Sequence, residues 1–129
     1  MREIKFRGKD LKRNKWVYGY FIFDSELQDN GGVECYYKEF ITSIPYIYDG
    51  EKYHIVELKT VGEYTGLKDK NGREIYEGDV AKYYSLIQGG ETLGQVHYVN
   101  GSFLIGECYL ANKRVEIVVN IYDNPELLK

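Results

Sequence analysis

Residues 60–83 constrain the fold of this chain more than any other stretch, because turn signals alternate there with short apolar and aromatic segments. The stretch holds four of the fourteen glycines and the dipeptide Asn71-Gly72. A type I′ turn needs two consecutive residues at positive φ, which Asn-Gly adopts at low cost. The dipeptide therefore predicts a tight β-hairpin. Gly78 is expected to form a second bend, which leads into a strand over residues 80–86.

The composition favours sheet over helix. Aromatic residues make up 16% of the 129-residue chain, and fourteen of them are tyrosines. Tyrosine and β-branched residues fit pleated, half-buried surfaces. Because each hydroxyl needs water or a partner, the tyrosines also indicate a layer with one wet face. Such a layer is either a binding surface or a tyrosine-rich rim of the core, and the core rim is the simpler interpretation.

The remaining strands are expected in hairpins. Residues 5–8 and 15–23 form the first pair, joined by a basic turn. The second strand of this pair is apolar on both faces, which predicts burial on both sides near its end. Asn100-Gly101 predicts another hairpin. Further strands are expected at residues 33–37, 40–44, 52–58, 94–99, 102–106 and 114–119. The polar loop 24–32 is expected to be the most flexible segment, and a short helical turn is expected to begin at Asn124.

These patterns predict a mainly β protein, β-rich α+β at most, of antiparallel strands and hairpins with very little helix. A chain of this length is one ordinary domain. We expect residues 1–59 to form an N-terminal β meander and residues 60–129 a barrel-like C-terminal part. The order of turns and strands in that second part resembles small SH3-like barrels, a fold that serves many functions.

Three blocks of the sequence together resemble the YopX family of phage and prophage proteins. They are residues 60–80, residues 1–9 with 16–19, and residues 120–128. The blocks lie in the middle, at the start and at the end, so the resemblance covers essentially the whole chain. It implies a single, small, β-rich YopX-like domain encoded by a phage or prophage. It brings no catalytic residue to carry over.

The charge of the chain is segregated. The net charge is −3 and the pI is near 5.4, which weighs against a protein that coats nucleic acid unselectively. Residues 1–16 carry a net charge of +5, however, and residues 17–66 carry −6. The basic residues 1–16 could bind the acidic residues 17–66 of another copy, or those of the same chain. It could also bind a small anionic ligand.

The sequence predicts a cytosolic protein with no membrane segment, and the family resemblance implies the cytosol of a bacterial host. It shows neither a signal peptide nor an apolar run near eighteen residues. Thiols stay reduced in the cytosol, so Cys35 and Cys108 are interpreted as small apolar residues.

The sequence lacks the common motifs of catalysis. The chain has no phosphate-binding or dinucleotide glycine motif, no Gly-x-Ser-x-Gly and no His-x-x-x-His pair. We therefore expect no enzyme, no cofactor and no metal site. The neighbouring acids Glu74, Glu77 and Asp79 are expected to be solvated or bonded to turn amides. His54 is expected to be a hydrogen-bonded structural residue rather than a base.

The leading hypothesis is a non-catalytic phage accessory protein that acts by protein–protein contact, either with copies of itself or with a host or phage protein. The alternative is a nucleic-acid-binding β-barrel protein that uses the basic N-terminal hairpin. The candidate nucleic-acid or anion contacts are Lys5, Arg7, Lys9, Lys12, Arg13, Lys15, Lys68, Lys70 and Arg73. Two simpler interpretations compete with this alternative. The cations at the tip of the hairpin over residues 68–73 could serve only to prevent edge-to-edge pairing of strands. Trp16 could be a core residue rather than a platform on which bases stack.

Overall fold

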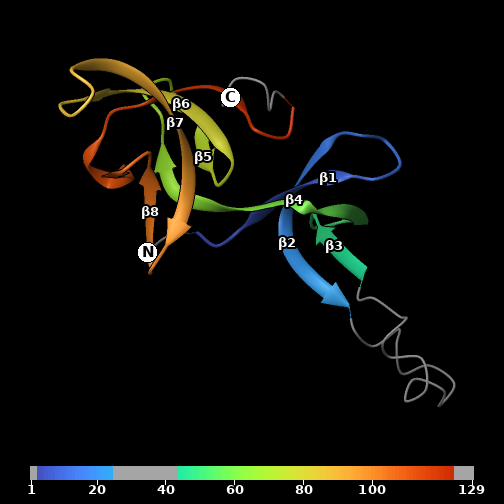
Figure 1. Ribbon diagram of the computed structural model, residues 1–129. Helices are drawn as coiled ribbons and strands as arrows, with labels where there is room; N and C mark the ends of the chain where they lie inside the picture. Colours follow the sequence, from blue (N-terminus) through green and yellow to red (C-terminus); the bar gives the residue numbers. More distant parts are fainter. Residues whose placement is uncertain (1–2, 25–43, 124–129) are drawn as a thin grey trace, which may run out of the picture. The chain divides into compact units, whose positions relative to one another are not determined.

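The structure is a computed structural model that describes residues 3–24 and 44–123. Contacts divide the chain into two compact units, Lys5–Val61 and Gly62–Lys129, with Glu3 and Ile4 in the second unit. The described chain is mainly antiparallel β with one short 3₁₀ turn, so the predicted fold class is confirmed (Figure 1). The SH3-like barrel and the division between residues 59 and 60 stay predictions. The expected strand 33–37, residues 25–32 of the expected loop 24–32, Cys35 and the turn at Asn124 lie outside the described residues.

The first unit contains four antiparallel strands: β1 (Phe6–Asp10), β2 (Trp16–Asp24), β3 (Ile44–Tyr48) and the first part of β4 (Tyr53–Lys68). β1 also pairs with β4, so the four strands close on themselves. Ile47 and Val56 are fully buried in this unit. Gly8 lies against Val56, where an added Cβ would come within 3.0 Å of the valine side chain. The hairpin predicted over residues 5–23 is confirmed by the β1–β2 register.

Strand β3 is the element of this unit that the sequence did not predict. A strand was expected at residues 40–44, of which 40–43 lie outside the described residues; the described strand includes Ile44 and continues through Pro45 to Tyr48. Proline has no N–H to donate and is tolerated where a ladder is one-sided. Pro45 pairs with Phe23 of β2, but the ladder to β4 begins one residue later, at Tyr46. The proline therefore lies where no donor to β4 is needed.

The second unit is built on a five-stranded antiparallel sheet with the order β10-β6-β7-β8-β9. Its strands are β6 (Asp79–Ser85), β7 (Gly90–Val99), β8 (Ser102–Ile105), β9 (Cys108–Tyr109) and β10 (Glu116–Asn120). The short β5 (Glu74–Tyr76) pairs with the last part of β4, and the 3₁₀ turn η2 covers Leu110–Asn112. The core comprises Ile75, Ala81, Tyr83, Val96, Ile105, Leu110, Val115 and Ile117.

The two Asn-Gly dipeptides fold differently. Asn100 and Gly101 both have positive φ, 51° and 85°, so the predicted tight turn between β7 and β8 is confirmed. The prediction of a type I′ turn at Asn71-Gly72 is wrong, because among these two residues only Gly72 has a positive φ. A hairpin still forms there, but its loop is organised by Asp69.

The carboxylate of Asp69 holds this loop from inside. Its Oδ1 accepts the N–H groups of Asn71 and Arg73, both at 2.9 Å. Its Oδ2 accepts the N–H of Ile117 in β10 at 3.0 Å. Burial raises the pKa of this carboxyl, but the three backbone N–H groups outweigh burial and hold the pKa below its usual range. The loop therefore follows the carboxylate rather than the preference of Asn-Gly.

Candidate functional site

Strand register places tyrosines side by side on one face of the first unit. Tyr20 lies opposite Tyr48, and Tyr48 lies opposite Tyr53, so all three project to the same side of the sheet. Successive residues of a strand project to opposite sides, and the neighbouring positions Ile47 and Val56 are buried. The tyrosines therefore project away from the core. We call this surface the tyrosine face; its members are Tyr18, Tyr20, Ile22, Tyr46, Tyr48 and Tyr53.

The tyrosine face is open to solvent. Tyr20 is 63% exposed and Tyr53 is 64% exposed, while Tyr46 and Tyr48 are half-buried. The rings form a cluster: the centroid of Tyr53 lies 4.6 Å from that of Tyr48 and 6.2 Å from that of Tyr46. The expectation that β2 is buried on both sides near its end is wrong at Tyr20 and Ile22, because these side chains project away from the core of the unit.

The cations of the N-terminal hairpin divide into engaged and exposed groups. Arg7 is only 6% exposed, and its guanidinium lies 4.7 Å from the centroid of the Trp16 ring. The ammonium of Lys9 lies 5.6 Å from the same centroid. The Trp16 ring is therefore engaged in cation–π contacts with Arg7 and Lys9. Lys5 is half-buried, whereas Lys12, Arg13 and Lys15 are exposed around the β1–β2 turn.

An acid lies beneath the exposed cations. Oδ1 of Asp10 accepts the N–H groups of Lys12 at 2.8 Å and Arg13 at 3.0 Å. The N–H of Arg13 is the main cause that lowers the pKa of Asp10. The turn that presents the cations is therefore fixed by an ionised carboxylate, which reduces its positive potential.

The remaining candidate cations belong to the second unit. Lys70 pairs with Glu116, with Nζ and Oε1 3.2 Å apart. Arg73 donates from Nη1 to the carbonyl oxygen of Ile117 at 3.4 Å. Both residues thus contact β10, and Lys68 is exposed. These three residues belong to the second unit, whereas the hairpin cations belong to the first.

The carboxylates at the central stretch have structural partners. Asp79 accepts the N–H of Tyr76 at 2.8 Å, and Glu77 accepts the N–H of Glu63 at 2.9 Å. Glu74 accepts the hydroxyl of Tyr76 at 3.0 Å. The expected bonding of acids to turn amides is confirmed at Asp79. Within residues 3–24 and 44–123, no three His, Cys, Asp or Glu residues cluster in a way that could hold a metal ion.

Sequence reasoning identified the residues of β2 but assigned the wrong surroundings to them. In the sequence, Trp16, Tyr18, Tyr20 and Ile22 occupy alternate positions of the strand, and tyrosine is in excess. Tyr53 was placed on a strand without a role. The signal that could have found the face is the pairing of tyrosines across strands, and this requires a register that only the folded sheet supplies.

The fold and this surface define a mainly β protein of two compact units, one of which carries an exposed aromatic face. The chain belongs to the YopX family: the family model described as YopX protein matches residues 5–129. The crystal structure of protein EF1440 from Enterococcus faecalis is similar, with a TM-score of 0.59 and 20% identity, and the match covers 100% of both chains. At this identity the likeness shows the fold alone. No curated protein matches the sequence.

None of the helical segments in the described ranges is long and apolar enough to cross a membrane.

Proposed function

We propose that this chain is a phage or prophage accessory protein of the bacterial host cytosol, and that it works by protein–protein contact through the tyrosine face rather than by catalysis. The observation that carries the proposal is the row formed by Tyr20, Tyr48 and Tyr53, in which the two outer residues are each more than half exposed. The partner is a second copy or a host or phage protein.

Tyrosine is a favourable residue for such a surface. It brings a large apolar ring and a hydroxyl at low cost in conformational entropy, and it is enriched in the cores of interfaces. The ring contacts of Tyr53 with Tyr46 and Tyr48 further limit the freedom of these side chains before binding. A partner therefore meets an aromatic surface that is already ordered.

The polar side chains considered for catalysis have structural partners. Glu74, Glu77 and Asp79 each accept a hydrogen bond that holds the second unit together. His54 lies between two carboxylates that themselves hold turns. A general base needs a position next to a substrate and a suitable pKa, whereas these groups are placed for structure.

A double substitution of Tyr20→Ser with Tyr53→Ser tests the proposal. Proteins that copurify from phage-infected cells are compared between the wild type and the variant, and self-association is measured by light scattering. Loss of a copurifying protein or of self-association, with the melting temperature kept, is the expected result. Tyr84→Ser is the matched control, because Tyr84 is 56% exposed in the second unit. Equal capture and equal mass for both variants would refute the role of the tyrosine face.

The exposed cations support the alternative function, nucleic-acid binding. Lys12, Arg13 and Lys15 lie together around one turn of the unit that carries the exposed tyrosines, and cations with aromatic rings are typical of surfaces that bind single strands. Against it, Trp16 and Arg7 are already paired with each other. A salt-dependent mobility shift with short oligonucleotides, weakened by Lys12→Glu with Arg13→Glu and kept by Lys82→Glu, would support it. No shift at low salt would end it.

A further inference from the structure

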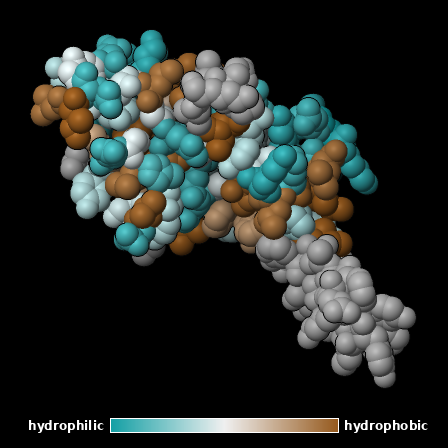
Figure 2. Space-filling view, in the orientation of Figure 1, coloured by the Kyte–Doolittle hydropathy of each residue, from teal (hydrophilic) through white to brown (hydrophobic). Residues whose placement is uncertain are grey.

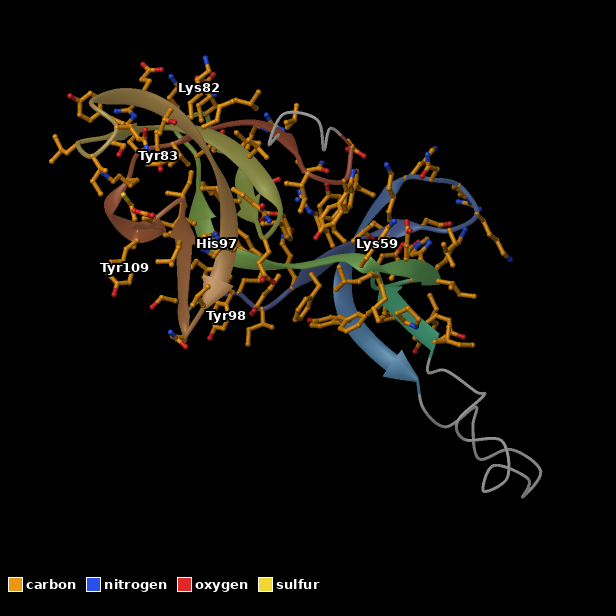
Figure 3. All side chains as sticks on the ribbon, viewed as in Figure 1. Lys59, Lys82, Tyr83, His97, Tyr98 and Tyr109 are labelled. Carbon is orange, nitrogen blue, oxygen red and sulfur yellow. The ribbon has the colours of Figure 1, made fainter. Side chains whose placement is uncertain are left out.

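The second unit contains a pocket lined by cations, with a volume of about 350 Å³. Three cations line it, and each comes from a different segment: Lys70 from the loop after β4, Lys82 from β6 and Arg114 from the segment before β10. Figure 2 shows hydrophilic side chains at the top of the second unit, and Lys82 lies at the same end in Figure 3. The volume is within the range of small-ligand sites.

Backbone contacts fix the segments that carry these cations. The N–H of Lys70 donates to the carbonyl oxygen of Val115 at 2.9 Å, so the loop after β4 is held next to Arg114. Lys82 lies opposite Glu116 in the register of β6 and β10. The fold therefore brings the three positive side chains together before any ligand binds.

The carboxylates of the pocket do not neutralise all of its cations. Oε1 of Glu116 lies 3.2 Å from Nζ of Lys70, so these two charges compensate each other. Within residues 3–24 and 44–123, neither Lys82 nor Arg114 forms an ion pair with a carboxylate. The other acid of the pocket, Glu91, is exposed and repels an anion. Two unpaired cations thus line the pocket against one unpaired carboxylate.

A further lysine adds positive potential at the edge of the pocket. Nζ of Lys113 donates to the carbonyl oxygen of Tyr84 at 3.0 Å. A carbonyl oxygen is a neutral acceptor, so the ammonium keeps its charge. Tyr84 itself lines the pocket and is 56% exposed, which leaves its ring open to a ligand. The pocket therefore combines an excess of positive charge with an aromatic wall.

We propose that this pocket binds a doubly charged phosphate group, carried by free phosphate or by a small phosphomonoester. Arg114 offers a planar fork of N–H donors that fits two phosphate oxygens, and Lys82 offers a point charge. A carboxylate or a phosphodiester carries only one charge and would leave one of these two cations unmatched, whereas a phosphomonoester carries nearly two at neutral pH. The site belongs to the second unit and does not depend on the tyrosine face of the first.

An NMR titration of the isotope-labelled protein locates the site. The probes are inorganic phosphate, glycerol phosphate and adenosine monophosphate, at about pH 7.5 and constant ionic strength. We expect saturable shifts of the amide signals of Lys82, Tyr84 and Arg114, and none at the hairpin cations Lys12 and Arg13. Equal affinity for the three probes would show that free phosphate is sufficient, and tighter binding of either ester would identify a phosphomonoester as the ligand.

Substitutions with opposite effects test the charges. Lys82→Ala and Arg114→Ala should each weaken binding about tenfold or more, because each removes a hydrogen bond between charged groups. Glu91→Gln should strengthen binding, because it removes a like charge from the pocket. Lys68→Ala is the matched control: Lys68 is an exposed lysine of the same unit that does not line the pocket. All four side chains are exposed, so the melting temperature should stay that of the wild type.

Three outcomes would overturn the inference: no saturable shift with any probe, shifts confined to the N-terminal hairpin, or alanine variants that bind as tightly as the wild type. Weaker binding by Glu91→Gln would also count against it. None of these outcomes affects the proposed function, because the pocket variants retain Tyr20 and Tyr53. Conversely, the variant with both tyrosines changed to serine retains the pocket and should bind phosphate like the wild type.

Discussion

His54 bridges Asp49 and Asp10: its Nε2 lies 2.7 Å from Oδ2 of Asp49, and its Nδ1 lies 3.2 Å from Oδ2 of Asp10. Each aspartate uses its other oxygen to hold a turn. Oδ1 of Asp10 accepts two N–H groups of the β1–β2 turn, and Oδ1 of Asp49 accepts two of the β3–β4 turn. One side chain of β4 thus joins two turns of the first unit, and the expectation of a hydrogen-bonded structural histidine is confirmed.

Replacing His54 with alanine should destabilise the protein. The imidazole is 12% exposed and has two carboxylate partners. Its loss removes both contacts, and the Oδ2 atom of the buried Asp10 loses its contact with the imidazole. Hydrogen bonds to charged groups contribute about 1.5–3 kcal/mol each at most, so we expect a loss of about 2 kcal/mol in the free energy of unfolding. Urea unfolding measures it. His97→Ala, which removes one bond to the Gln95 carbonyl, is the control and should cost less. Equal losses would contradict the bridging role.

Acid should weaken the protein through the same aspartates. The N–H of Lys52 is the main cause that holds the pKa of Asp49 far below its usual range, followed by His54. The N–H of Arg13 does the same for Asp10, although burial opposes it. Because the folded pKa lies below the unfolded value of about 3.9, this stabilisation is present above about pH 4 and is lost as the pH falls further.

The measurement is the urea midpoint between pH 6 and pH 3. Asp10→Asn with Asp49→Asn should be less stable than the wild type at pH 6, and the difference should shrink toward pH 3. Glu91→Gln changes an exposed carboxyl and serves as the control. A difference that does not change with pH would show that ionisation of the two aspartates contributes nothing.

Asp69→Ala should be among the most damaging substitutions in the second unit. Asp69 is 6% exposed and accepts three backbone N–H groups, which alanine would leave without that acceptor. Each unsatisfied buried donor costs about 1–3 kcal/mol, so a loss of about 3 kcal/mol is expected, seen as a large drop in melting temperature. Glu116→Ala breaks only the half-exposed pair with Lys70 and should cost less than about 1 kcal/mol. Similar drops for both would contradict the role of Asp69.

Gly78 and Gly72 should respond differently to substitution. Both have positive φ, 94° and 83°, which strains any L side chain by about 1–2 kcal/mol. A Cβ on Gly72 would meet nothing within 4 Å, whereas a Cβ on Gly78 would lie 2.7 Å from the ring of Tyr122. Gly78→Ala should therefore lower the melting temperature more than Gly72→Ala, and Gly72→Asn should be milder still. An equal drop in melting temperature for the two alanine substitutions would show that the contact with Tyr122 adds no cost at Gly78.

The candidate site was harder to predict than the fold. Alternation along residues 16–22 predicted a strand, and the turn residues predicted its hairpin. Whether Tyr20 faces the core or the solvent depends on which side of the sheet Ile47 and Val56 fill, and they come from two other strands. Likewise, Arg7 and Lys9 are cations in the sequence, but packing on Trp16 removes Arg7 from the exposed surface.

The sequence by itself determined the class of fold and those features that neighbouring residues alone control. Asn100-Gly101 is one such feature, because positive φ at two consecutive residues is a local preference. The tertiary structure alone decided the loop at Asn71-Gly72, where the same dipeptide gives a different turn. There the carboxylate of Asp69 binds the N–H of Ile117, 48 residues further along the chain. The three hydrogen bonds to this buried carboxylate outweigh a local turn preference of roughly a few tenths to one kcal/mol. The N–H of Ile117 cannot be identified as a donor from the residues next to Asn71 and Gly72.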